Sequence, residues 1–477
     1  MNIPLLELAT SQLGSNPWIL PVAGIIFIVG YIAIAFEHQL GIDKSATAML
    51  LGVVSLLLLD FQVGQSEMHH VALEILAHIA EVFFFLLPVM AIVLTLEQYH
   101  SFDVIIKRIL RLDSKHIVPS LLVVTFFLSA IIDNMTTILV MLPVIFALYG
   151  GRNSSRETQK KQLYLSAMLV ITANAGGVWS PIGDVTTTML WIARAITPTG
   201  VFINTFLASV VCASTAYLLF KNEWRMLTPV STQQVERKLR LDLLPSRVEI
   251  KILCLGLMGI SLGPLLKVTL GLPPWAGVTL GWAILHTYTE YIQRKLDPAE
   301  KNALSAEKNI FPSLDFSTLF FLFGILMAVF ALNSLGVLPE VVSYSEHHIV
   351  SLLPSFWAMV AICTLVGILS SVIDNVPLVA MFIAVYLSES VPEFILPATM
   401  FVTDGIFWQF LAYTVGVGGS LLIIGSVAGL AAMGLLKDLE ENMTFSWYFK
   451  FCMPRMFVAY LAGCLTFIGQ QFTMGTI

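Results

Sequence analysis

The sequence predicts an all-α polytopic membrane protein. Hydrophobic residues make up 57% of the 477 residues, only 12% are charged, and the mean hydropathy is +0.85. Apolar stretches of about 18 residues or more that recur along a chain are typical of transmembrane helices. We expect such spans at residues 18–36, 44–61, 71–96, 164–193, 201–220, 252–266, 275–290, 317–334, 395–433 and 454–470.

The composition also argues against several other classes of protein. No basic patch with interleaved aromatic residues is present, so nucleic acid is not an expected partner. The five cysteines are scattered and form no CxxC pair, which indicates packing residues. Residues 1–18 contain no Lys or Arg, so we expect no cleaved signal, and no motif calls for a cofactor.

Two stretches, 117–149 and 350–386, are too long for one span, and each carries an Asp-Asn pair in its middle. The pairs are Asp133-Asn134 and Asp374-Asn375. Each half of a stretch has about 15 residues, which is roughly 22 Å of helix, whereas the hydrocarbon core is about 30 Å thick. We therefore interpret each stretch as a re-entrant helical hairpin.

The basic residues support this topology. With both stretches as hairpins, 23 of the 25 Lys and Arg residues fall on one side, and only Arg194 and Lys267 fall on the other. The positive-inside rule makes the rich side cytoplasmic and both termini periplasmic, in the inner membrane of a bacterium. Two full crossings would give the same parity, so only the short half-lengths favour re-entrance.

An internal repeat accompanies the hairpins. The sequence Phe-Phe-Leu occurs at 84–86 and 320–322, the two Asp-Asn pairs lie 241 residues apart, and the pattern GG-x5-G-[DS]-V occurs at 176–185 and 418–427. Elements in one order at nearly one offset indicate a duplication. Because the hairpins open to opposite sides, we expect two inverted repeats, each with a re-entrant hairpin and a broken transmembrane helix, which is a layout of secondary transporters.

The expected organisation follows from this repeat. Residues 1–70 hold N-terminal helices, and residues 71–220 form the first inverted repeat, with hairpin 117–149 and broken helix 164–193. Residues 221–316 hold two connecting helices between cytoplasmic loops. Residues 317–477 form the second inverted repeat, with hairpin 350–386 and broken helix 395–433.

Acids and neutral oxygen ligands gather at the hairpin tips and helix breaks. An Asp at the bilayer centre costs roughly 2.5–3.5 kcal/mol, so intramembrane acids indicate a functional site. The predicted cation- and proton-binding residues are Asp133, Asn134, Thr136, Thr137, Asn174, Asp184, Thr186, Thr187, Ser370, Asp374, Asn375, Ser420 and Ser426. Hard oxygen ligands suit Na⁺ or Li⁺, which we expect at Asp133, Asn134, Asp184 and Asn375.

These residue types suit an exchange of ions. A desolvated carboxylate has a raised pKa and a bound cation lowers it, so one Asp can hold either a proton or a sodium ion. That competition is the minimum chemistry of an antiporter. The alternative for any one acid is a structural, hydrogen-bonded role, and the alternative for the glycines is close helix packing.

A polar stripe on another span is open to two interpretations. Glu74, His78 and Glu81 share one helix face within span 71–96. His78 could sense pH, because its unperturbed pKa lies near 6.5. An interfacial polar stripe explains the same pattern.

The Asp-Asn tips, the segment 172–177 (TANAGG) and the segment 183–187 (GDVTT) resemble the NhaD-type sodium/proton antiporters. That family belongs to the ion transporter superfamily, with dicarboxylate/sodium symporters and arsenite permeases. The resemblance implies Na⁺ or Li⁺ extrusion in exchange for H⁺ at alkaline pH, a homodimer and an elevator-like moving domain. It also implies activity-related roles for Asp133, Asn134, Asn174, Asp184, Thr186, Thr187, Ser370 and Asn375.

Two rival functions remain at this stage. A sodium-coupled transporter of dicarboxylate or arsenite-like anions would share the fold, but those symporters carry Ser-Asn-Thr at both tips, unlike this chain. An intramembrane aspartyl protease would use Asp133 and Asp184 as an enzyme. Its Gly-x-Gly-Asp motif is not met, because Pro181 stands where the first glycine belongs.

Overall fold

The computed structural model describes residues 18–35, 40–63, 65–149, 154–224, 246–295, 314–350, 352–387, 396–436 and 443–475. Within these ranges the chain is helical and contains no strand. The prediction of an all-α fold is therefore confirmed. The first 17 residues, where we expected no cleaved signal, lie outside the described ranges.

Seven described helices are long and apolar enough to cross a membrane. They are α4 (Lys44–Val63), α5 (Gln65–Gln98), α7 (Ser114–Ile132), α11 (Pro198–Trp224), α13 (Ser246–Leu270), α16 (Phe316–Ser334) and α23 (Met453–Met474). Their outward faces carry apolar side chains, such as Val268 at 76% exposure, as lipid contact requires. The protein is therefore a multi-pass membrane protein.

The first predicted hairpin and break appear as helix boundaries. The helices are α6 (Asp103–Leu110), α7, α8 (Asn134–Tyr149), α9 (Arg156–Gly177) and α10 (Val185–Ile192), followed by α11. Asp133 lies between α7 and α8, and residues 178–184 separate α9 from α10. Both interruptions fall where the Asp-Asn pair and the glycine pattern predicted them.

The second half follows the same order. Its helices are α17 (Val337–Val350), α18 (Ser355–Leu369), α19 (Asn375–Tyr386), η4 (Ala398–Met400), α20 (Ile406–Gly418), η5 (Ile423–Gly425), α21 (Val427–Leu436) and α22 (Phe445–Phe451). The remaining helices are α2 (Ile19–Ala35) and α14 (Pro274–Lys295). Residues 370–374, which end with Asp374, separate α18 from α19, and residues 419–426, which include η5, separate α20 from α21.

Some predicted boundaries were wrong. Helix α7 has 19 residues, about 28 Å, so the first hairpin arm is not short, whereas α8, α18 and α19 have 16, 15 and 12. The second broken helix begins at Ile406 rather than near residue 395, because Pro397, Gly405 and a positive φ of 62° at Asp404 interrupt the chain. Helix α5 continues through residue 70, and the division of the chain into domains stays a prediction.

The packing repeats at the offset seen in the sequence. Ser129 Oγ donates to the Ala173 carbonyl at 2.6 Å, and Ser370 Oγ donates to the Val415 carbonyl at 2.8 Å. Each bond ties the first arm of a hairpin to the helix that ends at the glycine pair. The two serines lie 241 residues apart, as the two Asp-Asn pairs do.

In each half of the chain, one glycine allows the hairpin to pack closely against the helix break. A Cβ atom at Gly183 would lie 2.8 Å from Ala130 Cα, and one at Gly425 would lie 2.5 Å from Ser371 Cα. No real Cβ tolerates such distances, so a glycine is required at both positions. The glycine pattern thus serves close packing as well as breaking the helices.

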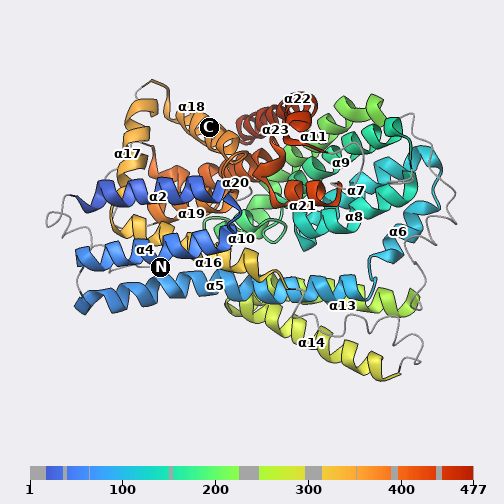
Figure 1. The fold of residues 1–477 in the computed structure, drawn as a ribbon, viewed down its shortest axis with the longest axis horizontal. Coiled ribbons are helices and arrows are strands. Elements are labelled where there is room, and N and C mark those ends of the chain that lie inside the picture. The colour runs from blue at the N-terminus through green and yellow to red at the C-terminus, as the bar shows by residue number, and fades with distance from the viewer. Residues whose placement is uncertain are drawn as a thin grey trace.

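The two hairpins lie in different halves of the molecule. In Figure 1, α7 and α8 lie on the right, and α18 and α19 lie on the left. Helices α10 and α19 pack against each other, and α21 packs against α8 and α9, so the breaks and tips of both halves meet near the middle. The inverted orientation of the two halves stays a prediction.

Candidate functional site

Asp133 sits at the tip of the first hairpin and caps α8. Its backbone has a φ of 81°, uncommon for a residue with a side chain. Both carboxylate oxygens accept from Thr136, one from its N–H and one from its Oγ, each at 2.8 Å. The Thr137 hydroxyl donates to the Asp133 carbonyl at 2.6 Å. Asp133 therefore has a local capping role, which is the structural alternative to the ion-binding role predicted from the sequence.

Asp184 precedes α10 at the first break and is only 4% exposed. One carboxylate oxygen accepts from the Thr186 hydroxyl. The other accepts from Asn134 Nδ2 at 3.3 Å, which reaches across from the first hairpin. The Thr187 hydroxyl donates to the Asp184 carbonyl at 2.9 Å. Asp184 is thus the buried acid that joins the hairpin to the break.

Asn174 links this acid cluster to the second half of the chain. Asn134 Nδ2 also donates to Asn174 Oδ1 at 2.8 Å, and Asn174 Nδ2 donates to Ser426 Oγ at 3.1 Å. Ser426 occupies the second break with φ −136° and ψ 146°, close to the −143° and 146° of Asp184. Of the two repeat partners, Ser426 bonds Asn174 directly, whereas Asp184 is linked to Asn174 through Asn134.

Asp374 marks the second tip but makes different contacts. It caps α19, where its carboxylate accepts from the Val376 N–H at 3.1 Å. Tyr31 of α2 donates to the Asp374 carbonyl at 3.4 Å. Asp184 lies within electrostatic range of both Asp133 and Asp374. The three acids consequently form one electrostatic group although they share no direct hydrogen bond.

The charges of these three acids are not neutralised by any basic side chain that the structure describes. In the part of the chain that the structure describes, Asp133, Asp184 and Asp374 form no ion pair with Lys, Arg or His. Nor do three or more His, Cys, Asp or Glu side chains of the described residues gather into a metal-binding group. The available donors are mixed carboxylate, amide and hydroxyl oxygens, which suit a hard monovalent cation.

Seven of the predicted residues lie outside the hydrogen-bonded cluster: Asp133, Thr136 and Thr137, which bond one another at the first tip, and Asp374, Ser370, Asn375 and Ser420 in the second half. The hydroxyls of Ser370 and Ser420 donate to backbone carbonyls, Ser370 to Gly367 at 2.9 Å and Ser420 to Val417 at 2.6 Å. Asn375 is buried at the start of α19. The serines support the backbone at the second tip and break, and the structure brings together Asn134, Asn174, Asp184, Thr186 and Ser426.

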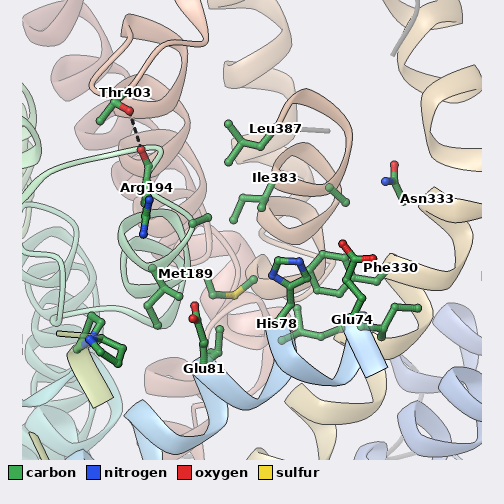
Figure 2. Close-up of a pocket in the computed structure, with 18 of the residues that line it drawn as sticks. Glu74, His78, Glu81, Met189, Arg194, Phe330, Asn333, Ile383, Leu387 and Thr403 are labelled. Atoms are coloured by element: carbon green, nitrogen blue, oxygen red, sulfur yellow. Dashed lines mark hydrogen bonds between the residues drawn. The ribbon is translucent and has the colours of Figure 1, made fainter. Parts of the chain in front are cut away.

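The polar stripe of α5 faces a separate cavity of about 790 Å³ (Figure 2). Glu74, His78 and Glu81 all line it, and the His78 ring stacks on Phe330 of α16 with 5.4 Å between centroids. None of the predicted cation-binding residues lines this cavity. The stripe is therefore not part of the acid cluster, and its role in pH sensing stays a prediction.

Sequence reasoning missed some contributors. Tyr31 touches the second tip, and Tyr448 donates to the Ser420 carbonyl at 2.7 Å, as Thr205 does to the Val178 carbonyl at 3.2 Å in the first half. In the sequence, each of these contributors is recognisable only as a hydroxyl-bearing residue in a mainly apolar segment. One such hydroxyl does not identify its partner, because only the tertiary fold brings them together.

Known proteins resemble this chain over most of its length. Residues 31–418 match a family model described as citrate transporter (CitMHS). Sodium/proton antiporter 1 of Arabidopsis thaliana is 32% identical over 452 residues, covering 93% of this chain and 71% of that protein. The Na(+)/H(+) antiporter NhaD of Vibrio cholerae is 31% identical over 441 residues, covering 86% and 84%.

A third relative gives the same result. The Na(+)/H(+) antiporter NhaD of Alkalimonas amylolytica is 29% identical over 476 residues and covers 92% of this chain and 88% of that protein. The relatives come from a plant and from bacteria. The chain is a transporter rather than an enzyme, and it belongs to the CitMHS family of the ion transporter superfamily, where its homologues include the Na⁺/H⁺ antiporters NhaD.

Proposed function

We propose that this protein is a secondary active transporter that exchanges Na⁺ or Li⁺ for H⁺ and extrudes sodium at alkaline pH. The observation that carries this proposal is the buried Asp184, which accepts hydrogen bonds from Asn134 and Thr186 and has no basic partner among the residues that the structure describes. A carboxylate without a countercharge in a membrane needs either a proton or a cation.

The chemistry of exchange follows from that need. A proton and a cation each neutralise the same carboxylate, so Asp184 holds one of them at a time. Asn134, Asn174 and Ser426 supply neutral oxygens that can replace part of the hydration shell of a bound Na⁺. Because Asn174 and Ser426 come from different halves, closure of the site depends on both.

The relatives support this choice of ions, since those named above are called sodium/proton antiporters. We further propose two inverted repeats with re-entrant hairpins, a homodimer, and an inner-membrane location with both termini periplasmic. The offset of 241–242 residues between equivalent contacts supports the repeat. The 23-to-2 division of basic residues supports the orientation.

The test is a ΔpH assay in everted membrane vesicles. A preformed ΔpH is monitored with a pH-sensitive dye while Na⁺, Li⁺ and K⁺ are added in turn between about pH 7 and 9.5. We expect Na⁺ or Li⁺ to dissipate ΔpH. Failure of every alkali cation, together with sodium-dependent uptake of succinate or arsenite, would favour the anion transporter instead.

A further inference from the structure

The cavity beside α5 lies close to the acid cluster but is separate from it. Helix α10 begins directly after Asp184, and its residues Met189 and Ile192 line the cavity. Met189 follows Asp184 by five residues, which is about 8 Å along a helix. Helix α19, which begins after Asp374, contributes Ile383, and its C-cap residue Leu387 also lines the cavity. The cavity therefore touches both helices that the tip and break acids cap.

The cavity lies towards the side of the molecule that is poor in basic residues. Arg194 and Lys267 are the two basic residues predicted to lie on the periplasmic side, and both line this cavity. A volume of about 790 Å³ has room for roughly two dozen water molecules. The lining is mostly apolar but includes five ionisable side chains, Glu74, His78, Glu81, Arg194 and Lys267, and these make the space suited to hydrated ions.

Its charges are divided between two ends. Lys267 Nζ donates to the Trp191 carbonyl at 2.8 Å, lies 4.5 Å from the centroid of the Trp191 ring, and interacts electrostatically with Arg194 and Glu81. In Figure 2, Arg194 and Glu81 lie on the left, whereas Glu74 lies on the right. Arg194 and Lys267 therefore share one end of the cavity with Glu81, and their two positive charges outnumber its single negative charge, so a cation is repelled there.

The opposite end carries two oxygen acceptors, the Glu74 carboxylate and the Asn333 amide oxygen, with the His78 ring beside Glu74. Glu74 forms no hydrogen bond or ion pair within the described part of the chain. Asn333 of α16, on the same right-hand side of Figure 2, is 1% exposed, and its Oδ1 is buried without a hydrogen-bond partner. Leaving such an acceptor unsatisfied costs about 1–3 kcal/mol, so it calls for a water molecule or a cation.

We infer that the Glu74–Asn333 end of this cavity is a second, outer binding place for the transported monovalent cation. This inference rests on the proposed function. The cation leaving the Asp184 cluster passes along α10 and α19 into the cavity and is held by Glu74 and Asn333 before it reaches the outer solution. Arg194 and Lys267 keep cations away from the other end.

The test compares the two faces of the membrane. Added Na⁺ meets the outer face in right-side-out vesicles and the cytoplasmic face in everted vesicles. We expect Glu74→Gln to raise the half-saturating Na⁺ concentration about fivefold at the outer face and by less than about twofold at the cytoplasmic face, since one unit charge in a hydrated space is worth about 1 kcal/mol. The matched control is Glu340→Gln, an exposed glutamate of α17.

A second variant guards against a change in folding. Asn333→Leu removes the amide oxygen at nearly constant volume, and replacing an unpartnered buried polar group by an apolar one does not weaken folding. We expect the same one-sided shift. Equal shifts at both faces, or none at either, would overturn the second binding place. If the unaltered protein moves no protons when Na⁺ is added at either face, it is the proposed function that fails.

Discussion

Asp133 and Asp184 should differ in what their charge does, although both are intramembrane acids. Both carboxylate oxygens of Asp133 already accept hydrogen bonds from Thr136 at the start of α8. Asn is as good an N-cap as Asp, so Asp133→Asn keeps the cap. It exchanges charge-assisted bonds for neutral ones, a loss of about 1 kcal/mol in folding free energy.

Asp184→Asn removes the charge from the centre of the oxygen cluster. A unit charge about 4 Å from a cation is worth roughly 4 kcal/mol at an effective dielectric constant near 20, which corresponds to roughly a thousandfold in affinity. The amide can still bond Asn134 and Thr186, so the fold should persist. We therefore expect Asp184→Asn to abolish exchange and Asp133→Asn to retain a measurable fraction.

The assay is Na⁺-induced dissipation of ΔpH in everted vesicles for both variants, with protein amounts checked by immunoblot. Asp184→Glu serves as the conservative control, because it keeps the charge and moves it by one methylene. Near-normal exchange by Asp184→Asn would refute the role of this carboxylate as carrier. Complete loss in Asp133→Asn, with exchange retained in Asp184→Asn, would reverse the assignment.

Three further predictions concern the site, the packing and the topology. Asn174→Leu, which removes the bridge between the two halves, should weaken apparent Na⁺ affinity in the ΔpH assay by about tenfold, since one buried hydrogen bond to a polar site is worth about 1.5 kcal/mol. Gly425→Ala should lower the melting temperature of the purified protein because its Cβ meets hairpin backbone, whereas Gly434→Ala, with open space, should not. For the topology, single cysteines are placed at Ser155 or Glu340 in a variant without native cysteines. In intact cells, an impermeant thiol reagent should label the cysteine at Glu340 and should not label the one at Ser155. Labelling of both would contradict the orientation.

Glu340 is a suitable position for the topology test because it is exposed at the start of α17, which leads into the second hairpin.

The sequence predicted the interruptions well because each has a local chemical cause. Asp-Asn pairs cap new helices, and the glycine patterns end α9 and α20 where expected. It predicted the lengths of flanking elements less well. Helix α17 was not expected. It lies outside every predicted apolar span, because it contains the polar residues Glu340, His347 and His348.

The contacts across the two halves could not be predicted. Asn174 and Ser426 are 252 residues apart, and nothing in either neighbourhood specifies the other. The local role of Asp133 was equally hidden, because an intramembrane acid can bind an ion or cap a helix with the same sequence signature. Only the position of Thr136 relative to the carboxylate separates the two roles.

The close glycine contacts have a consequence for how such a protein can change its cargo. At Gly183 and Gly425 the backbone of the break packs directly against the backbone of the hairpin, so the backbone conformation around the site can change little. The residue that follows each glycine, Asp184 or Ser426, has the same extended conformation and yet a different charge. A duplicated gene could therefore alter the charge of the site one side chain at a time without rebuilding its frame. A single ancestral scaffold could in this way give rise to carriers of cations and carriers of anions.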